Sequence, residues 1–351
     1  MSLNESQYNL DNFLANLHDW IKQFAINEKP GYYFYKPIDK NKTKTKPLSL
    51  YGTTDMVFTL YITDELDNYF DSFTDEKRES WLEAIQSFQK PKTGWFTQGS
   101  WNYYTLHFKE HSTAYAAAAL KLLDGKPKYS LKLSRDLITK QAVEKWLEKM
   151  HWGLLFWPGS HRGGGVPAYF LTTGEIPHKN FFDWYFNWLD KEADPEVGFW
   201  RRGRIHKIKK DRLTKHELGG SIHFYWIYEF MKRPIPYPEK VIDSTLRLQN
   251  ELGLWDKKLG YCIDLDAIFS LNRCCQQTDG YRKDDIDKAI IKFLDYTIPK
   301  LNDRNFLFNN YKDSHRITGY LETIAEIQKY YPNLIKTPKP WRESLDIAPW
   351  V

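Results

Sequence analysis

Apolar residues recur at intervals of three and four along most of the chain, and the alternation of apolar and polar residues that is typical of strands is nearly absent. The spacing predicts amphipathic helices over six ranges: 8–27, 74–90, 138–150, 180–193, 239–251 and 282–298. One apolar and one polar face are typical of helices on the outside of a bundle. We therefore expect an all-α protein in which these segments are the outer helices.

A second set of segments lies between the first and has a different polarity. Their polar residues gather at the front, and the rest of each segment is apolar on nearly every side, which is typical of a buried helix. These segments begin near Tyr51, His111, Gly163, Gly219, Ile263 and Ser314. They predict six inner helices, each paired with one outer helix.

The inner segments start about 50 residues apart, which is the size of a helical-hairpin repeat. A turn with glycine and an aromatic residue recurs between the two members, as "TGWF" at 93–96, "WGLLFW" at 152–157, "VGFW" at 197–200 and "LGLW" at 252–255. We expect the glycine to end the outer helix in a left-handed cap and the aromatic ring to fill the seam between hairpins. An open solenoid would have the same period, but its inner helices usually carry a polar stripe. The pattern favours an (α/α)6 toroid of six hairpins, a single domain over 1–351 with a C-terminal extension at 332–351.

Two inner segments match each other closely. "DMVFTL" at 55–60 and "DAIFSL" at 266–271 share aspartate, a β-branched residue, phenylalanine, a hydroxyl residue and leucine, which places Asp55 and Asp266 at equivalent positions. The same register brings Tyr115, His223 and Arg316 to that level. We expect these side chains to lie at one height in the centre of the toroid.

Parallel inner helices would open all their N-termini at one end, where the helix dipoles favour an anionic group and where acids and bases converge. The candidate catalytic residues at this mouth are Asp266, Asp55, His111, His223 and His315. The candidate substrate-binding residues are Tyr115, Trp95, Trp200, Arg316, Asp264, His161 and Arg162.

Several candidates also have a structural interpretation. Asp264 could cap the helix that follows it, and residues two apart on a helix differ by ~200° in direction, so Asp264 and Asp266 cannot both face the centre. Asp266 is the better catalytic candidate, because it has a counterpart in Asp55. His223 could be a buried histidine with one satisfied hydrogen bond. The glycines of "SHRGGGVPAYF" at 160–170 could cradle an anion, but they favour a close approach between helices.

Composition narrows the classes of function. Aromatic residues make up 17% of the chain, with 14 Trp and 23 Tyr, which favours a protein with an aromatic-lined pocket. The net charge of +5 is mild, and its densest basic block, at 201–216, is local, so a nucleic-acid partner is not expected. That block is either a solvated loop or a flap that contacts an anionic substrate.

The N-terminal segment lacks the pattern of a signal peptide, and no apolar run is long enough to span a membrane. Three cysteines without a paired framework agree with a reducing compartment, so we expect a cytoplasmic protein. The cofactor is undetermined. Cys262, Asp264 and His315 would offer a sulfur, oxygen and nitrogen set for zinc, although the close-spaced pairs of familiar zinc sites are missing.

The sequence resembles the superfamily of terpenoid cyclases and protein prenyltransferases. "LRLQNELGLW" at 246–255 is similar to the superfamily's Gln-x-x-x-Gly-x-Trp element at Gln249, Gly253 and Trp255. "DLDA" at 264–267 is similar to the Asp-x-Asp-Asp of class II cyclases, with Ala in place of the last Asp. The resemblance implies an α/α toroid, an isoprenoid substrate and a proton-donating role for Asp266. The prenyltransferase branch holds zinc with Asp-x-Cys and a later His; here the order is Cys262-x-Asp264, followed by His315.

Other enzymes use the same barrel on carbohydrates, including glycoside hydrolases, polysaccharide lyases and sugar epimerases. "EHSTAY" at 110–115 is similar to the Asn-His-Ser element of some alginate-type lyases. Aromatic residues would stack sugar rings, and candidates for this are Trp95, Trp101, Tyr103, Tyr104 and Trp200. Either Asp55 with Asp266 or a His, Tyr and Arg set would supply the chemistry. A noncatalytic binding toroid is the third alternative. The substrate is therefore a small isoprenoid or a glycan, and the oligomeric state is open, a monomer being sufficient.

Overall fold

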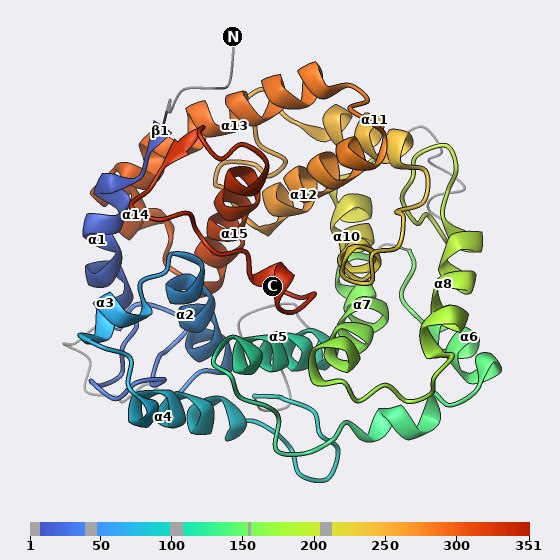
Figure 1. Ribbon diagram of the computed structural model, residues 1–351, viewed down its shortest axis with the longest axis horizontal. Coiled ribbons are helices and arrows are strands. Elements are labelled where there is room, and N and C mark those ends of the chain that lie inside the picture. The colour runs from blue at the N-terminus through green and yellow to red at the C-terminus, as the bar shows by residue number, and fades with distance from the viewer. Residues whose placement is uncertain (1–7, 39–47, 99–107, 154–155, 204–212) are drawn as a thin grey trace.

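The computed structural model describes residues 8–38, 48–98, 108–153, 156–203 and 213–351 (Figure 1). Over these residues the chain is built from helices and loops, so the all-α prediction is confirmed. A short parallel pair joins β1 (Tyr8–Asn9) to β2 (Ile335–Lys336) and brings segments from near the two ends of the chain together. No helix in the described ranges is both long enough and apolar enough to cross a membrane.

Six helices surround the centre of the molecule (Figure 1). They are α2 (Leu50–Ile62), α5 (Lys109–Leu122), α7 (Phe156–Thr173), α10 (Lys215–Phe230), α12 (Cys262–Gln277) and α15 (Ser314–Tyr330). Each packs on the next in chain order, and α15 returns to α2, so the contacts form a closed cycle. Buried residues lie on every side of these helices, as the sequence predicts for the inner set.

A second set of helices lies outside the first (Figure 1). They are α1 (Asp11–Lys22), α4 (Asp75–Gln86), α6 (Lys140–Glu148), α8 (Phe181–Glu192), α11 (Pro238–Leu248) and α13 (Lys283–Asn302). Shorter elements complete the described chain: α3 (Leu66–Phe70), α14 (Arg304–Asn310) and the 3-10 helices η1 (Lys132–Asp136) and η2 (Ser344–Asp346). The outer helices bury one face against the inner set and leave the other exposed.

The third inner helix starts earlier than the sequence pattern suggests, at Phe156 rather than near Gly163. Its glycines allow close packing, because a Cβ on Gly164 would lie 2.6 Å from the His223 carbonyl oxygen of α10. The interpretation of these glycines as a close approach between helices is therefore confirmed. Pro167 has no N–H for the Gly163 carbonyl, and the Tyr185 hydroxyl of α8 donates to that carbonyl instead, at 2.8 Å.

The glycine turns between outer and inner helices adopt the expected left-handed conformation. Gly94, Gly198 and Gly253 have φ values of 81°, 78° and 85°. They lie several residues after the outer helices end, so they belong to the turn and not to the helix cap. In the last of these turns, the Trp255 indole donates to the Thr245 carbonyl of α11 at 2.7 Å, which ties the turn to its own outer helix.

The glutamine before the turn joins neighbouring hairpins. The Gln249 amide donates to the Gly253 carbonyl at 2.9 Å and to the Ala289 carbonyl of α13 at 2.8 Å. Gln89 makes the matching bond to Gly94 at 3.0 Å and another to a carbonyl of the loop after α5. The Gln-x-x-x-Gly-x-Trp element therefore has a structural role, and we call it the fastener. The side-chain nitrogens of its glutamine and tryptophan donate to backbone carbonyl groups.

The chain after β2 returns to the centre of the molecule. η2 contacts both α10 and α2, and the chain end marked C lies within the circle of inner helices (Figure 1). Trp350, in this last segment, is 0% exposed. The C-terminal segment therefore contributes buried residues to the core.

Candidate functional site

Four histidines from four inner helices meet in the centre of the molecule. They are His111 of α5, His161 of α7, His223 of α10 and His315 of α15, and we call them the histidine cluster. The ring centroids of His111 and His161 are 4.7 Å apart, those of His161 and His223 are 5.0 Å apart, and those of His111 and His315 are 5.7 Å apart. All four side chains are buried. Imidazoles this close can exchange protons with one bound substrate.

One face of α2 lies against this cluster. Tyr51, Asp55 and Phe58 are spaced by four and three residues and therefore point the same way. The Tyr51 hydroxyl is 2.9 Å from Nδ1 of His111, and the Phe58 ring stacks on Tyr115 with centroids 4.5 Å apart. The helical period thus places a hydroxyl, a carboxyl group and a ring in successive layers.

Asp55 is the hydrogen-bonding hub of the site. Its carboxyl oxygens accept hydrogen bonds from the Tyr115 hydroxyl at 2.8 Å, from the Ser314 hydroxyl, and from Nδ1 of His315 at 2.9 Å. A histidine that donates from Nδ1 to a carboxyl group presents Nε2 as its basic atom. Burial, followed by the negative charge of Asp55, raises the pKa of Tyr115 well above its ordinary value, so its hydroxyl stays protonated. Asp55 therefore orients its neighbours and is not itself open to a substrate.

The other cluster histidines are oriented by neighbouring groups. The Ser160 hydroxyl lies 2.6 Å from Nδ1 of His223 and joins α7 to α10. Burial lowers the pKa of His161 well below its ordinary value, and the charges of His223 and His315 lower it further. His161 is therefore neutral near pH 7 and can accept a proton only when the site relaxes or a ligand compensates the charge.

Trp350 covers one side of the histidine cluster. Its ring stacks on His223 with centroids 4.7 Å apart and planes 22° apart, and it meets His111 edge to face at 5.4 Å. It also meets His161 at 6.3 Å and Trp226 at 5.6 Å. A residue from the C-terminal segment is thus part of the wall of the site.

Asp266 lies on the inward face of α12. It is 2% exposed, and Phe269 and Arg273, one and two turns further along the same face, line a pocket of about 360 Å³. Burial raises the pKa of the Asp266 carboxyl well above its ordinary value, and the nearby charge of Asp264 adds to the effect. Its Oδ2 is buried with no hydrogen-bond partner among the described residues. The raised pKa favours the protonated form of Asp266, which is the form that a proton donor needs.

Asp264, which the sequence offers either as a helix cap or as a ligand-binding residue, takes the capping role in the structure. Its Oδ1 accepts the backbone N–H of Trp255 at 2.7 Å and its Oδ2 that of Tyr261 at 2.9 Å, so it caps α12 and fixes the preceding turn. Burial raises its pKa to about 7, against the opposing effect of the two backbone hydrogen bonds.

The hypothetical zinc set of Cys262, Asp264 and His315 is not assembled. Both oxygens of Asp264 accept backbone hydrogen bonds, and Nδ1 of His315 is bonded to Asp55. The part of the chain that the structure describes contains no group of three or more His, Cys, Asp or Glu side chains with metal-binding geometry. All three cysteines are free thiols.

Two of the predicted substrate-binding residues lie elsewhere. Trp200 is fully buried between α8 and α10, and its indole donates to the Leu189 carbonyl at 2.9 Å, so it has the same structural role as Trp255. Arg316 is partly exposed and pairs with Asp313 at 2.8 Å. His315, one residue earlier, takes the inward position that the repeat register assigned to Arg316.

Arg162 and Trp95, two further predicted binding residues, have contacts with other side chains. The Arg162 guanidinium lies 6.0 Å from the ring of Trp146 on the outer helix α6, and therefore points away from the centre. Trp95 is half-buried, with the Lys109 ammonium 4.8 Å from its ring. Trp101, Tyr103 and Tyr104 lie outside the described residues, as does most of the basic block at 201–216.

Sequence reasoning missed four contributors to the site: Tyr51, Ser160, Ser314 and Trp350. Tyr51 had a usable signal, because it lies one helical turn before Asp55 and must share its face. Ser160 and Ser314 each directly precede a candidate histidine. Nothing local marks Trp350, since it reaches the site only through the path of the C-terminal segment.

Comparison of the chain with protein-family models, with curated proteins and with solved structures finds no match.

Proposed function

We propose that the chain is an (α/α)6 toroid of six helical hairpins. The support is the closed cycle of contacts from α2 through α5, α7, α10 and α12 to α15 and back to α2. An outer helix precedes each inner helix along the chain, as a hairpin repeat requires. In such a toroid the site of reaction is the centre, where side chains from all repeats converge.

We further propose that the protein is an acid–base enzyme that acts on a carbohydrate, either by elimination or by inversion at a sugar carbon. One observation carries this proposal: the four histidines, Asp55 and two tyrosines from five inner helices converge on one buried volume. Lyase and epimerase chemistry requires a base that removes a proton from carbon and an acid that returns one. General acid–base catalysis of this kind typically contributes 10²–10⁴-fold to the rate.

The hydrogen bonds support the following roles in this proposal. His315, oriented by Asp55, removes the proton through Nε2. Tyr115, which keeps its proton because its pKa is raised, and His111 with Tyr51 are the candidate donors on the neighbouring side.

An isoprenoid cyclase is the second candidate, and Asp266 favours it. A buried carboxylic acid with a raised pKa is the group that protonates an alkene in a class II cyclase-like reaction, and Asp266 has both properties. The histidine cluster argues against this candidate, because imidazole nitrogens beside a carbocation would trap or deprotonate it. The carbohydrate proposal is therefore preferred.

A product screen separates the two candidates. The wild-type protein would be incubated with a panel of uronate-containing and neutral oligosaccharides and, separately, with linear isoprenoids. We expect unsaturated or inverted sugars from one member of the first panel and no cyclised product from the second. Cyclised isoprenoids that disappear in Asp266→Asn but persist in Tyr115→Phe would overturn the carbohydrate proposal in favour of the second candidate.

A further inference from the structure

The last residues of the chain form a strap across the ends of the inner helices. We define the strap as residues 340–351. The backbone N–H of Arg342 donates to the Ile62 carbonyl at the end of α2 at 2.8 Å, and the N–H of Leu345 donates to the Glu322 carboxyl group of α15 at 3.1 Å. The strap is thus bonded to two inner helices before it reaches the centre.

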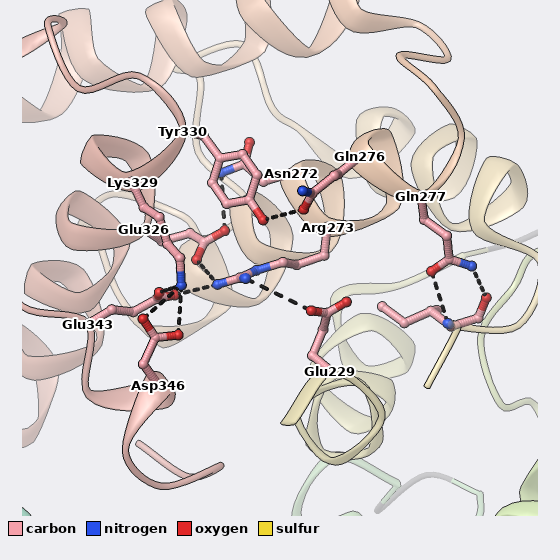
Figure 2. Close-up of polar contacts among 11 residues, drawn as sticks. Glu229, Asn272, Arg273, Gln276, Gln277, Glu326, Lys329, Tyr330, Glu343 and Asp346 are labelled. Atoms are coloured by element: carbon pink, nitrogen blue, oxygen red, sulfur yellow. Dashed lines mark hydrogen bonds and ion pairs between the residues drawn. The ribbon is translucent and has the colours of Figure 1, made fainter. Parts of the chain in front are cut away.

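A buried group of charges fixes the strap at Glu343 and Asp346 (Figure 2). Arg273 of α12, whose side chain is 11% exposed, donates to Glu326 of α15 at 2.8 Å and to Glu343 at 2.7 Å. Lys329 of α15 donates to Glu343 and, at 2.6 Å, to Asp346. Figure 2 shows the Arg273 guanidinium between Glu326, Glu343 and Glu229 of α10. The charges therefore hold the strap to α12 and α15 at positions four and seven residues before Trp350.

The protonation of this group favours the bound strap. Burial opposes ionisation of Glu343, but the hydrogen bond with Glu326 and the charges of Arg273 and Lys329 outweigh it and lower the pKa to about 2. Burial and the charge of Glu343 raise the pKa of Glu326 well above its ordinary value. Glu326 therefore carries a proton and Glu343 a negative charge, so that two cations face one buried anion on the strap.

Beyond Asp346 the strap turns inward. Ala348 and Pro349 are buried, and Trp350 reaches the histidine cluster. Trp350 has ring contacts with three of the four cluster histidines, from α5, α7 and α10. If Trp350 served only as a hydrophobic anchor, its ring would not need to stack in parallel on an imidazole. Its indole Nε1 is also buried with no hydrogen-bond partner among the described residues. This placement links the strap to the chemistry of the site.

We infer that Trp350 is a positioning residue of the acid–base site. Its ring holds the imidazole plane of His223 by stacking, and it keeps water from His111 and His161. The role of Trp350 in catalysis rests on the proposed function, whereas its contacts with the histidines do not depend on that function. The Ser160 hydroxyl is hydrogen-bonded to Nδ1 of His223, and the Trp350 ring stacks on one face of its imidazole. These two contacts restrict rotation of the His223 ring. Loss of the indole admits water to the cluster, and hydrated imidazoles bind protons more readily.

The test is a histidine titration by proton NMR on the full chain, with the wild type, Trp350→Ala and Trp350→Phe. We expect Trp350→Ala to raise the pKa of His161 by about one unit or more, since desolvation is the largest cause of its depression. Trp350→Phe keeps a stacking ring and should restore most of the wild-type titration. Trp184→Ala is the matched control, because Trp184 stacks on His178 outside the cluster and should leave His161 unchanged.

Chemical modification gives a second readout that tolerates loss of stability. Diethyl pyrocarbonate labels accessible neutral imidazoles, and mass spectrometry assigns the label to each histidine. We expect roughly tenfold faster labelling of His111, His161 and His223 in Trp350→Ala, in proportion to their new access to solvent, while His178 is unchanged. Labelling of all histidines at equally raised rates would mean global unfolding, and Trp350→Leu, which keeps volume without a stack, would then replace Trp350→Ala.

The outcomes separate the inference from the proposed function. If the titration and labelling of the cluster are the same in the wild type and in every folded Trp350 variant, Trp350 is not a positioning residue, whatever reaction the protein performs. If they change as expected while no sugar reacts with the wild type, the inference on Trp350 stands and the carbohydrate proposal fails.

Discussion

Two aspartates two positions apart on α12 have opposite roles, and the helical period is the reason. Asp264 points back to the turn and accepts two backbone N–H groups, whereas Asp266 lies on the face that carries Phe269 and Arg273. The sequence predicts this division, because a rotation of ~200° separates the two side chains. It could not predict that both oxygens of Asp264 are used, since one of the two donors, the N–H of Trp255, lies nine residues away.

Measurements of stability can distinguish the roles of Asp264 and Asp266. We expect Asp264→Ala to lower the free energy of unfolding by about 2 kcal/mol, because it leaves two buried backbone donors without acceptors. Asp266→Asn should change it by less than about 1 kcal/mol, because Asp266 is already neutral and amide and carboxylic acid have nearly the same shape. Urea unfolding followed by circular dichroism measures both. Equal losses would mean that Asp266 is also a structural residue.

The histidine cluster was only partly predictable at this scale. His111, His223 and His315 are recognisable as candidates because each lies in a predicted inner helix. The sequence could not show that His315 takes the inward position in place of Arg316, because a shift of one residue in a divergent repeat does not change the apolar pattern.

At the level of elements, hairpins are joined by side chains that serve backbone groups. Gln249 bridges its own turn and the next outer helix, and Gly253 needs its positive φ because an added Cβ would lie 2.5 Å from the Lys292 carbonyl oxygen. The sequence predicted the turns well, since the glycine and aromatic positions recur. It misplaced the start of α7, because the glycines and prolines there have poor helix propensity and only the close packing on α5 and α10 compensates.

The fastener can be tested by deletion of its amide. We expect Gln249→Ala to lower the free energy of unfolding by about 2 kcal/mol, because the carbonyls of Gly253 and Ala289 lose their donor in a partly buried site. Gln276→Ala is the matched control, since Gln276 is exposed and its side-chain oxygen accepts a hydrogen bond from the Tyr330 hydroxyl. Equal stability of the two variants in chemical denaturation would exclude a fastening role.

At the scale of the whole molecule, most of the features that the sequence could not reveal are long-range contacts. The parallel pair of β1 and β2, the cycle from α15 back to α2 and the path of the strap all join residues far apart in the chain. A periodic pattern specifies which face of a helix is buried but not what lies against it. The position of Trp350 among the histidines therefore could not be inferred from the residues around it.

Buried carboxyl groups give the whole molecule an unusual pH dependence. Burial raises the pKa of Glu322 to about 8 and that of Asp264 to about 7, so the folded state retains protons that the unfolded state loses above about pH 4 to 5. Stability from these groups is therefore full at acidic pH and falls as the pH rises toward 8. Glu343 acts in the opposite direction, because its pKa of about 2 means that stability is lost as the pH falls below its ordinary range.

Together these groups predict a stability maximum near pH 5, with a decrease of a few kcal/mol by pH 8. Thermal unfolding at constant ionic strength across this range measures it. Glu322→Gln keeps an oxygen for the Leu345 N–H but cannot ionise, so it should flatten the decrease. A wild-type maximum at or above pH 8 would contradict the buried, protonated state of these carboxyl groups.

The central claim is that the histidine cluster, oriented by Asp55, transfers protons to and from a sugar. The most direct measurement is mass spectrometry of the oligosaccharide panel after incubation in heavy water, where inversion puts deuterium on a carbon and elimination gives an unsaturated product. We predict one of these products with the wild type, a loss of 10²-fold or more in His315→Gln, a similar loss in Tyr115→Phe, and the wild-type amount in His178→Gln. Neither product from any sugar, or equal amounts from His315→Gln and His178→Gln, would contradict the account.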